Sequence, residues 1–311
     1  DVPTTYDEFI EMLTRFKNEI PECTAPYTAP GLKSTQALPE FYQGATADYV
    51  KVDGKWVDGM AQDNMLTALQ NLQDAYTAGL IDQEAITNTT SACRDEWYAG
   101  TVGCFPYWGG LWGETLTVRL KQNVPDAEVI ALPPIEGATY LYSAPSVQVI
   151  SSKLSDEQVA SVYKYFIEYM HDGGEGQVLF QSGVEGVHWQ QSGNNIDPLP
   201  TISKPAEAFR KAWITPWLAL TPMTATDKNV EVSQEATDSL AVVSANAKNI
   251  SVFPVSEQRT MITSDLTTTR ENIISRVAMG QLTPEEGMAE YKAQAETLNV
   301  AQALEEMNAN A

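Results

Sequence analysis

The sequence predicts an α/β protein in which helices dominate. Amphipathic helical segments alternate with a few short, isolated apolar runs that read as strands. The 311 residues are enough for about two domains, and 43% of them are hydrophobic, which supplies a proper core. Global disorder is therefore excluded, despite a formal charge of −22.

The chain has 41 acidic residues and only 19 basic ones, a balance that argues against two classes of partner, nucleic acids and anionic membranes. An acidic surface repels phosphate backbones, and no basic stripe occurs along the chain, so nucleic-acid binding is not expected. Anionic membrane surfaces are disfavoured for the same reason, and no apolar run is long enough to span a bilayer. We therefore expect a globular protein whose partner is neutral or cationic.

Helical segments are indicated by capping patterns and by apolar residues three and four positions apart. Thr5 with Glu8, and Ser155 with Gln158, have the spacing of capping boxes. Gly79 stands where a left-handed residue is expected to end a helix. Helices are predicted over 3–19, 62–78, 91–99, 155–171, 175–182, 206–218 and 265–279 and from Thr283-Pro284-Glu285-Glu286 onward, and the one over 155–171 is expected to bury Val159, Val162, Phe166, Ile167 and Met170.

Strands are expected to be few and short. Residues 50–57 form two strand-like runs around Asp53-Gly54, which is a strong hairpin signal. Residues 129–132 and 147–150 are also predicted to be strands. Residues 190–204 are polar and are expected to form a loop.

No catalytic or metal-binding pattern is present in the sequence. His171 and His188 lie near no nucleophile motif, so a helix-end or surface role is the plainer interpretation. Cys23, Cys93 and Cys104 fit no metal spacing; either Cys93 pairs with Cys104, or all three are buried thiols. No glycine-rich phosphate loop follows a strand, and no carboxylate pair for glycoside hydrolysis can be singled out in so acidic a chain. We expect neither a metal nor a cofactor.

The most informative segment is residues 100–114, where glycines separate large aromatic side chains. Glycines allow sharp turns at the end of a strand, and ligand sites are commonly built from loops there. An aromatic face can pack on the apolar face of a sugar ring. Trp108 and Trp112 are therefore either ligand platforms or core residues, and Trp189, Trp213 and Trp217 have the same two interpretations.

Five motifs occur in a fixed order along the chain. They are Val2-Pro3-Thr4-Thr5-Tyr6-Asp7-Glu8-Phe9, the Asp53-Gly54-Lys55-Trp56-Val57 hairpin with the helix end at 76–82, Trp97-Tyr98-Ala99-Gly100-Thr101-Val102-Gly103, Gly183-Val184-Glu185-Gly186-Val187-His188-Trp189, and the helix pair of 274–294. Together they resemble the extracellular solute-binding proteins of carbohydrate ABC importers (family 1), particularly the lipoprotein type of Gram-positive bacteria.

The resemblance implies a fold, a domain organisation and a location. The fold would be periplasmic-binding-protein-like II, with two helix-rich lobes of which one is incomplete, because the family carries an N-terminal segment ahead of the first motif. Residues 1–140 would form the C-terminal lobe, 141–250 the hinge with the remainder of the N-terminal lobe, and 251–311 helices that pack on the C-terminal lobe. The protein would be extracellular and held at the cell surface by a lipid anchor in the N-terminal segment that the family carries ahead of the first motif.

The resemblance also implies ligand contacts. The family places aromatic residues directly after the strand near residue 103, which favours Trp108 and Trp112 as ligand platforms. Tyr107 and Glu114 would add a polar tip and a carboxylate acceptor for sugar hydroxyls. Glu185 either contacts ligand or holds its turn by accepting backbone N–H groups. The predicted ligand-binding residues are Tyr107, Trp108, Trp112, Glu114, Glu185 and Trp189.

The implied function is to capture a sugar or oligosaccharide between the lobes and deliver it to the permease subunits of an ABC transporter. Two alternatives stay open. The same fold also serves binding proteins for peptides and other small solutes. A secreted carbohydrate-active enzyme would instead need a general acid and a second carboxylate in one cleft.

Overall fold

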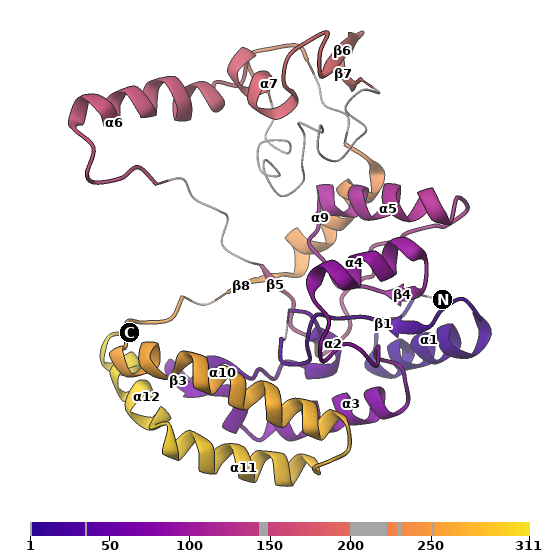
Figure 1. Cartoon of the computed structure of the whole chain (residues 1–311), viewed down its shortest axis with the longest axis vertical. Helices are drawn as coiled ribbons and strands as arrows, with labels where there is room; N and C mark the ends of the chain where they lie inside the picture. Colours follow the sequence, from indigo (N-terminus) through magenta and orange to yellow (C-terminus); the bar gives the residue numbers. More distant parts are fainter. Residues whose placement is uncertain (1, 35, 143–148, 200–222, 229–231, 251) are drawn as a thin grey trace. The chain divides into compact units, whose positions relative to one another are not determined.

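The computed structural model describes residues 2–34, 36–142, 149–199, 223–228, 232–250 and 252–311 (Figure 1). The chain divides into two units, which are treated separately below. Unit 1 comprises Asp1–Trp108, Leu116–Ala144 and Ala241–Ala311. Unit 2 comprises Gly109–Thr115 and Pro145–Leu240.

The first helix of unit 1, α1 (Tyr6–Glu19), begins at the predicted capping box. The Glu8 N–H donates to Thr5 Oγ1 (3.3 Å), and the Glu8 carboxylate accepts the Thr5 N–H (3.1 Å). Phe9 and Leu13 are fully buried on the inner face of the helix. The helix predicted over 3–19 is thus confirmed.

A small parallel sheet lies next to α1. Strand β1 (Ala25–Tyr27) pairs with β4 (Val102–Cys104), with Tyr27 opposite Cys104. Ile81 forms a further parallel bridge with Tyr27. Because all three segments run in the same direction, their carboxyl ends meet at one edge, which is where open α/β sheets usually bind ligands.

The predicted hairpin is present as β2 (Tyr49–Val52) and β3 (Lys55–Asp58), paired antiparallel. Asp53 and Gly54 have φ values of 49° and 80°. Positive φ at both central residues is the requirement of the tight turn that Asp-Gly favours.

The remaining helix ends of the chain largely follow their local signals. Gly79 and Gly280 have φ values of 65° and 71°, as expected of residues that end helices. Ser155 and Thr283 both form capping boxes. Helix α3 (Asn64–Thr77) matches the helix predicted over 62–78.

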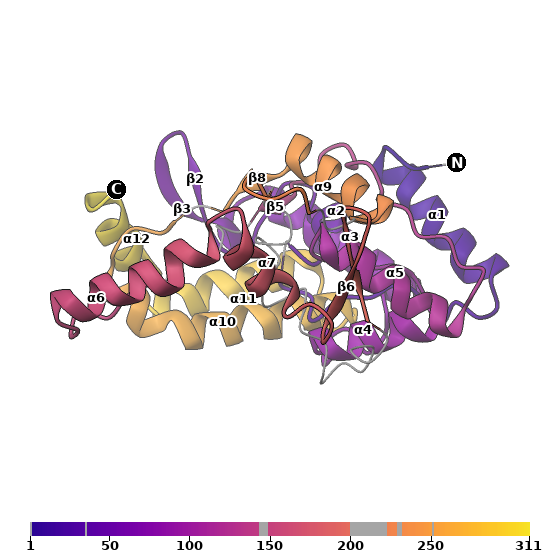
Figure 2. The same ribbon diagram turned by 90° about the horizontal axis from the view of Figure 1, so that it is seen from above.

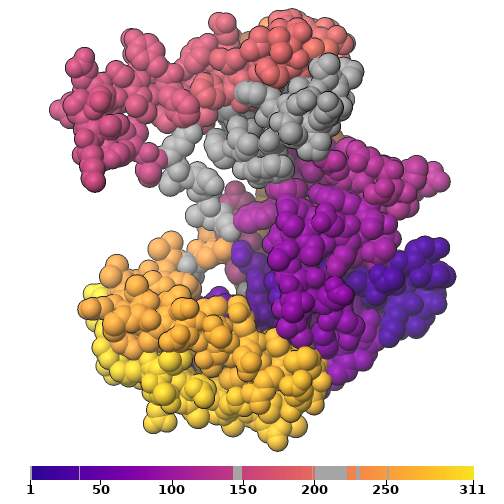
Figure 3. Space-filling model, in the orientation of Figure 1, coloured from indigo at the N-terminus to yellow at the C-terminus, as the bar shows by residue number. Residues whose placement is uncertain are grey.

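Three helices complete unit 1 at the end of the chain: α10 (Glu257–Ala278), α11 (Pro284–Thr297) and α12 (Val300–Ala309). They lie side by side and pack against α3 and the hairpin (Figures 1 and 2), and Figure 3 shows their side chains covering one face of the unit. Helix α10 starts eight residues before the predicted position 265, capped by Ser256. Its first turns are rich in polar and β-branched residues, which hide the helical pattern.

A buried ion pair joins these helices to the hairpin. Arg270 on α10 donates to Asp58 Oδ1 through Nη2 (2.7 Å), and the Tyr291 hydroxyl on α11 donates to Asp58 Oδ2 (2.6 Å). Arg270 also lies 3.4 Å from the exposed Asp48 carboxylate. Three elements far apart in the sequence are thereby held together.

Further elements of the chain were predicted in part. Helix α4 matches the prediction over 91–99, whereas α5 falls in a segment for which no helix was predicted. These elements are α2 (Pro39–Tyr42), η1 (Gly59–Ala61), α4 (Thr90–Ala99), α5 (Leu111–Asn123), β5 (Leu141–Tyr142), α9 (Gln234–Asn246) and β8 (Lys248–Asn249), with β5 and β8 paired parallel.

Unit 2 contains α6 (Asp156–Val162), continued by the π-helical turn η2 (Tyr163–Glu168), and then α7 (Glu175–Ser182). The predicted buried face of the first helix is largely wrong, since Val162 and Phe166 are exposed while Met170 is buried. Periodicity identifies an apolar face, whereas burial requires a partner element to cover it.

The segment predicted as a loop over 190–204 contains a hairpin instead. Strand β6 (Trp189–Ser192) pairs antiparallel with β7 (Asn195–Pro198). The strands are mostly exposed and polar, so they lack the alternation of apolar residues that predicts strands. Trp189 and Ile196 pack with Val178 as a small core.

Two other predictions are not met by regular structure. Residues 129–132 are irregular, and the exposed segment runs into Pro133-Pro134, neither of which can donate to a strand ladder. In the strand predicted over 147–150, residues 149–150 are irregular and 147–148 lie outside the described residues. The helix predicted over 206–218, with Trp213 and Trp217, also lies outside them.

The three cysteines are free thiols, so the alternative in which Cys93 pairs with Cys104 is wrong. Burial raises the pKa of the Cys23 and Cys93 thiols. Low thiolate content makes them small apolar residues rather than nucleophiles.

Candidate functional site

An aromatic row follows the carboxyl end of β4 in unit 1. The ring centroids of Trp97 and Phe105 lie 6.1 Å apart, and those of Phe105 and Tyr107 lie 4.9 Å apart. Arg94 on α4 donates to the Tyr107 hydroxyl (3.2 Å) and to Ser91 Oγ (2.9 Å). Burial raises the pKa of Tyr107 against the opposing effect of Arg94. The predicted site residue Tyr107 is therefore held in place from both its ring and its hydroxyl.

The two tryptophans of this segment differ in exposure. The side chain of Trp108, directly after the aromatic row, is 57% exposed, whereas Trp112 on α5 is 9% exposed. An indole face can stack on a ligand only where solvent can be displaced from it, so Trp108 meets that requirement. The burial of Trp112 favours its core interpretation, and its ligand role stays a prediction.

Glu114, in the first turn of α5, carries a carboxylate oxygen without a hydrogen-bond donor. Oε2 is buried and has no partner in the part of the chain that the structure describes. A buried acceptor left unpaired is costly, and most buried polar groups in native proteins have a protein, water or ligand partner. A ligand hydroxyl that donates to Oε2 would remove this cost.

Close packing positions the helix turn that carries Glu114. The Gly110 N–H donates to Ser239 Oγ of α9 (2.8 Å). A Cβ atom at Gly113 would lie 3.1 Å from the Glu235 carbonyl oxygen. Glycines at the start of α5 thus allow the two helices to approach each other closely.

A polar cluster that the sequence did not reveal lies at the carboxyl edge of the sheet in unit 1. The buried Thr28 Oγ1 lies 2.8 Å from Glu96 Oε2 and 3.2 Å from Asp82 Oδ2. The Asn88 amide donates to the same two carboxylates, at 2.5 Å to Asp82 and 3.3 Å to Glu96. Burial, with the neighbouring Asp82 charge, raises the pKa of Glu96.

This carboxylate pair gives the sheet edge a negative charge. Thr28 follows β1 directly, and Asp82 follows the bridge at Ile81. The one available signal was the position of Asp82 immediately after an apolar Leu80-Ile81 pair. Glu96, from the next helix, could be placed beside it only by the tertiary structure.

The motif of residues 183–189 forms a turn held by histidine rather than by glutamate. The Val184 N–H donates to His188 Nδ1 (2.9 Å), and a Cβ atom at Gly183 would lie 2.7 Å from that nitrogen. Trp189 is buried, and its Nε1–H donates to the Gly183 carbonyl (2.9 Å). Glu185 is exposed. These contacts favour structural roles for His188 and Trp189, while the ligand roles of Glu185 and Trp189 stay predictions.

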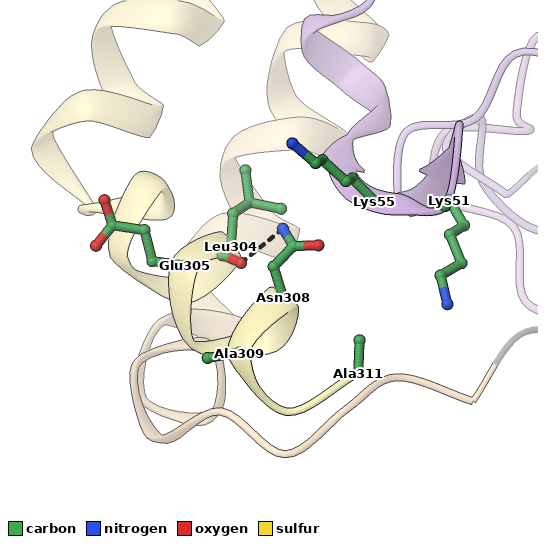
Figure 4. Close-up of a pocket in the computed structure, with 8 residues that line it drawn as sticks. Lys51, Lys55, Leu304, Glu305, Asn308, Ala309 and Ala311 are labelled. Carbon is green, nitrogen blue, oxygen red and sulfur yellow. Dashed lines mark hydrogen bonds between the residues drawn. The ribbon is translucent and has the colours of Figure 1, made fainter.

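A separate surface pocket of about 660 Å³ lies between the β2–β3 hairpin and α12 (Figure 4). None of the predicted site residues lines it. Lys51 and Lys55 point to opposite sides of it, and Asn308 is engaged by the backbone of Trp56. The pocket therefore lacks the convergent polar groups of a specific ligand site.

The described residues include neither a membrane-spanning helix nor a metal-binding cluster. No helix among them combines the length and apolar character needed to cross a membrane. No three His, Cys, Asp or Glu side chains gather within that part of the chain as a metal ion would need.

No protein-family model and no curated protein matches the sequence. Solved structures do match. The alginate-binding protein AlgQ2, solved without calcium, has a TM-score of 0.66 at 16% identity, over 100% of this chain and 68% of its own. A solute-binding protein associated with an HMO-binding ABC transporter of Bifidobacterium longum infantis has a TM-score of 0.66 at 15% identity, over 99% and 69%. The substrate-binding protein FusA of an S. pneumoniae ABC transporter, in complex with kestose, has a TM-score of 0.63 at 17% identity, over 99% and 68%.

These similarities extend over essentially the whole chain. They confirm the predicted fold class, a helix-rich α/β fold of the periplasmic-binding-protein-like kind.

Proposed function

We propose that this chain, whose fold is that of ABC-transporter solute-binding proteins, is the substrate-binding component of a carbohydrate importer. It captures a sugar or oligosaccharide in a cleft between lobes that close about a hinge, and delivers it to the permease subunits. Residues 1–140 with 251–311 form the C-terminal lobe, and residues 141–250 supply the hinge and part of the N-terminal lobe. The protein acts outside the cell, at its surface, through a lipid anchor in the N-terminal region, and it is not an enzyme.

The similar structures support the ligand class. AlgQ2 is an alginate-binding protein, and FusA was solved with kestose, so both are associated with carbohydrates. The sequence motifs point to the same class independently of fold. The acidic surface of this chain is compatible with a neutral ligand, which it does not repel.

The single observation that carries the proposal is the buried Glu114 Oε2, which has no hydrogen-bond partner among the described residues. Sugar hydroxyls are donors as well as acceptors, so they can satisfy this oxygen where a purely apolar ligand cannot. The exposed Trp108 supplies an aromatic face, and Tyr107 a hydroxyl whose position is held by Arg94. Trp112, Glu185 and Trp189 complete the proposed ligand-binding set, without a contact that supports them as strongly.

Thermal unfolding in the presence of mono- and oligosaccharides tests the proposal. A ligand at 100 times its Kd stabilises the folded state by about 2.7 kcal/mol, which raises the unfolding temperature by several degrees. The Trp108→Ala and Glu114→Gln variants should lose that shift while unfolding normally without ligand. Tyr165→Ala and Glu136→Gln, which change exposed residues of the same types outside the proposed set, should keep it.

Three outcomes would contradict the proposal. A thermal shift with peptides or amino acids, and with no carbohydrate, would assign the chain to a different ligand class. Release of reducing sugar from an oligosaccharide would indicate an enzyme. A carbohydrate shift that survives both Trp108→Ala and Glu114→Gln would place the site elsewhere.

A further inference from the structure

A buried carboxyl group without a cation lies in unit 1. Glu40 on α2 is 8% exposed and forms no ion pair with any described residue. The groups that face its carboxyl are the hydroxyls of Tyr27 on β1 and Tyr140 ahead of β5, together with the backbone N–H of Glu40 itself. The thiol of Cys104 on β4 is the other titratable neighbour. A buried carboxylate with no positive charge nearby is expected to be unfavourable.

The Tyr27 hydroxyl lies within hydrogen-bond distance of two acceptors but has one proton to donate. The Tyr27 hydroxyl oxygen lies 2.9 Å from both the Ala37 carbonyl oxygen and Glu40 Oε2. A tyrosine has one hydroxyl proton, and the carbonyl can only accept. If Tyr27 donates to Ala37, its contact with Glu40 is favourable only when Glu40 Oε2 is itself the donor.

The second oxygen of Glu40 is satisfied without a further proton. The Tyr140 hydroxyl accepts the Ile135 N–H (3.1 Å) and donates to Glu40 Oε1 (2.9 Å). When Glu40 is protonated, its O–H therefore donates to the Tyr27 hydroxyl oxygen, and the Tyr27 O–H donates to the Ala37 carbonyl oxygen. Each donor proton in this cluster then points at one acceptor oxygen.

We propose that Glu40 is a neutral carboxylic acid in the folded protein, and that its proton completes a hydrogen-bonded series from Glu40 through Tyr27 to Ala37, beside the segment that carries Tyr140. This segment, residues 135–142, ends in β5, where the Lys248 N–H donates to the Tyr140 carbonyl (2.9 Å). Tyr140 thus links the Glu40 carboxyl group to the start of this strand pair.

Ionisation of Glu40 has a defined structural effect. A negative charge on Oε2 would face the lone pairs of the Tyr27 oxygen unless Tyr27 turned its proton away from Ala37. Either choice leaves a buried acceptor at 2.9 Å from another acceptor. Burial raises the pKa of Glu40, which agrees with a protonated carboxyl group at this position. Rising pH should therefore disrupt the contact between Glu40 and Tyr27, whereas the Tyr140 hydroxyl, which donates to Oε1, keeps its acceptor.

Infrared spectroscopy of the purified chain tests the protonation state directly. Protonated carboxyl groups absorb at higher frequency than carboxylates, and exposed carboxyl groups are ionised at neutral pH. We expect a protonated-carboxyl band at neutral pH that loses intensity in Glu40→Gln; any remainder belongs to other carboxyl groups with a raised pKa, such as Glu96. The matched control Glu136→Gln, an exposed residue in the same turn, should retain the full band. Absence of the band from the native chain, or an undiminished band in Glu40→Gln, would overturn the proposal.

A second variant keeps the test decisive if Glu40→Gln does not fold. Tyr140→Phe removes the hydroxyl that donates to Oε1, a bond that favours the ionised form. The band should then disappear at a higher pH than in the native chain. An unchanged or lower midpoint would refute the role of Tyr140. Neither measurement uses a sugar, so these results are independent of the proposed transport function.

Discussion

The buried ion pair between α10 and the hairpin offers a sharp test of what holds unit 1 together. Replacing Asp58 by Ala removes both the carboxylate that pairs with Arg270 and the acceptor of the Tyr291 hydroxyl. The Arg270 side chain is only 4% exposed, so its charge would stay buried without its closest partner. Removing one partner of a buried pair typically costs 3–5 kcal/mol.

The structure sets where in that range the cost should fall. Asp48, with 59% of its side chain exposed, lies 3.4 Å from Arg270 and retains part of the compensation. The guanidinium also lies 5.1 Å from the centroid of the Tyr49 ring and 5.8 Å from that of Tyr291. We therefore expect a loss of about 3 kcal/mol in the free energy of unfolding of unit 1, at the lower end of the range.

Urea unfolding followed by tryptophan fluorescence and by circular dichroism measures this loss. The matched control is Asp48→Ala, which removes an exposed partner of the same arginine and should cost less than about 1 kcal/mol. A cost below about 1 kcal/mol for Asp58→Ala, or equal costs for the two variants, would refute the reasoning. It would mean that water stabilises the Arg270 charge as well as the Asp58 carboxylate does.

Three further predictions rest on local geometry. Thr283→Ala removes the side-chain acceptor of the α11 capping box and should cost about 1 kcal/mol in urea unfolding, whereas Thr263→Ala on the exposed face of α10 should cost less than half of that. Gly59→Ala would place a Cβ atom 2.3 Å from the carbonyl oxygens of Thr46 and Asp48, so the unfolding temperature should fall by several degrees, and an unchanged value would contradict the packing at this turn. The raised pKa of Glu40 means that its neutral form stabilises the fold at low pH and that this contribution is lost as pH rises through the folded-state pKa. The unfolding free energy of the native chain minus that of Glu40→Gln should therefore fall as pH rises, and a difference that grows with pH would show that Glu40 is held ionised.

Features that depend on neighbouring residues were predictable from the sequence. The capping boxes at Thr5, Ser155 and Thr283 and the tight turn at Asp53-Gly54 each involve residues within four positions of one another. The backbone of such a short segment has few alternatives, so residue type largely decides its conformation. The fold class could be predicted because these local elements occur in an order that resembles a known family.

The strand and burial predictions failed where a partner from elsewhere in the chain was required. Residues 129–132 have the composition of a strand but no neighbouring strand to pair with among the described residues. Val162 and Phe166 have the spacing of a buried helix face, yet they stay exposed, although the Phe166 ring contacts that of Phe180 on α7. Pairing and burial are properties of two segments, and a periodic pattern describes only one of them.

The sequence by itself determined the helix-rich α/β class, the capped starts of α1, α6 and α11, and the aromatic segment as the place to look for a ligand site. The tertiary structure decided which of Trp108 and Trp112 is open to solvent, and among the described residues it gives Glu114 Oε2 no donor. It also placed Glu40 between Tyr27 and Tyr140, residues separated by 13 and 100 positions from it. Exposure, desolvation and hydrogen-bond pairing depend on distances between remote segments, and those distances are set only when the core packs.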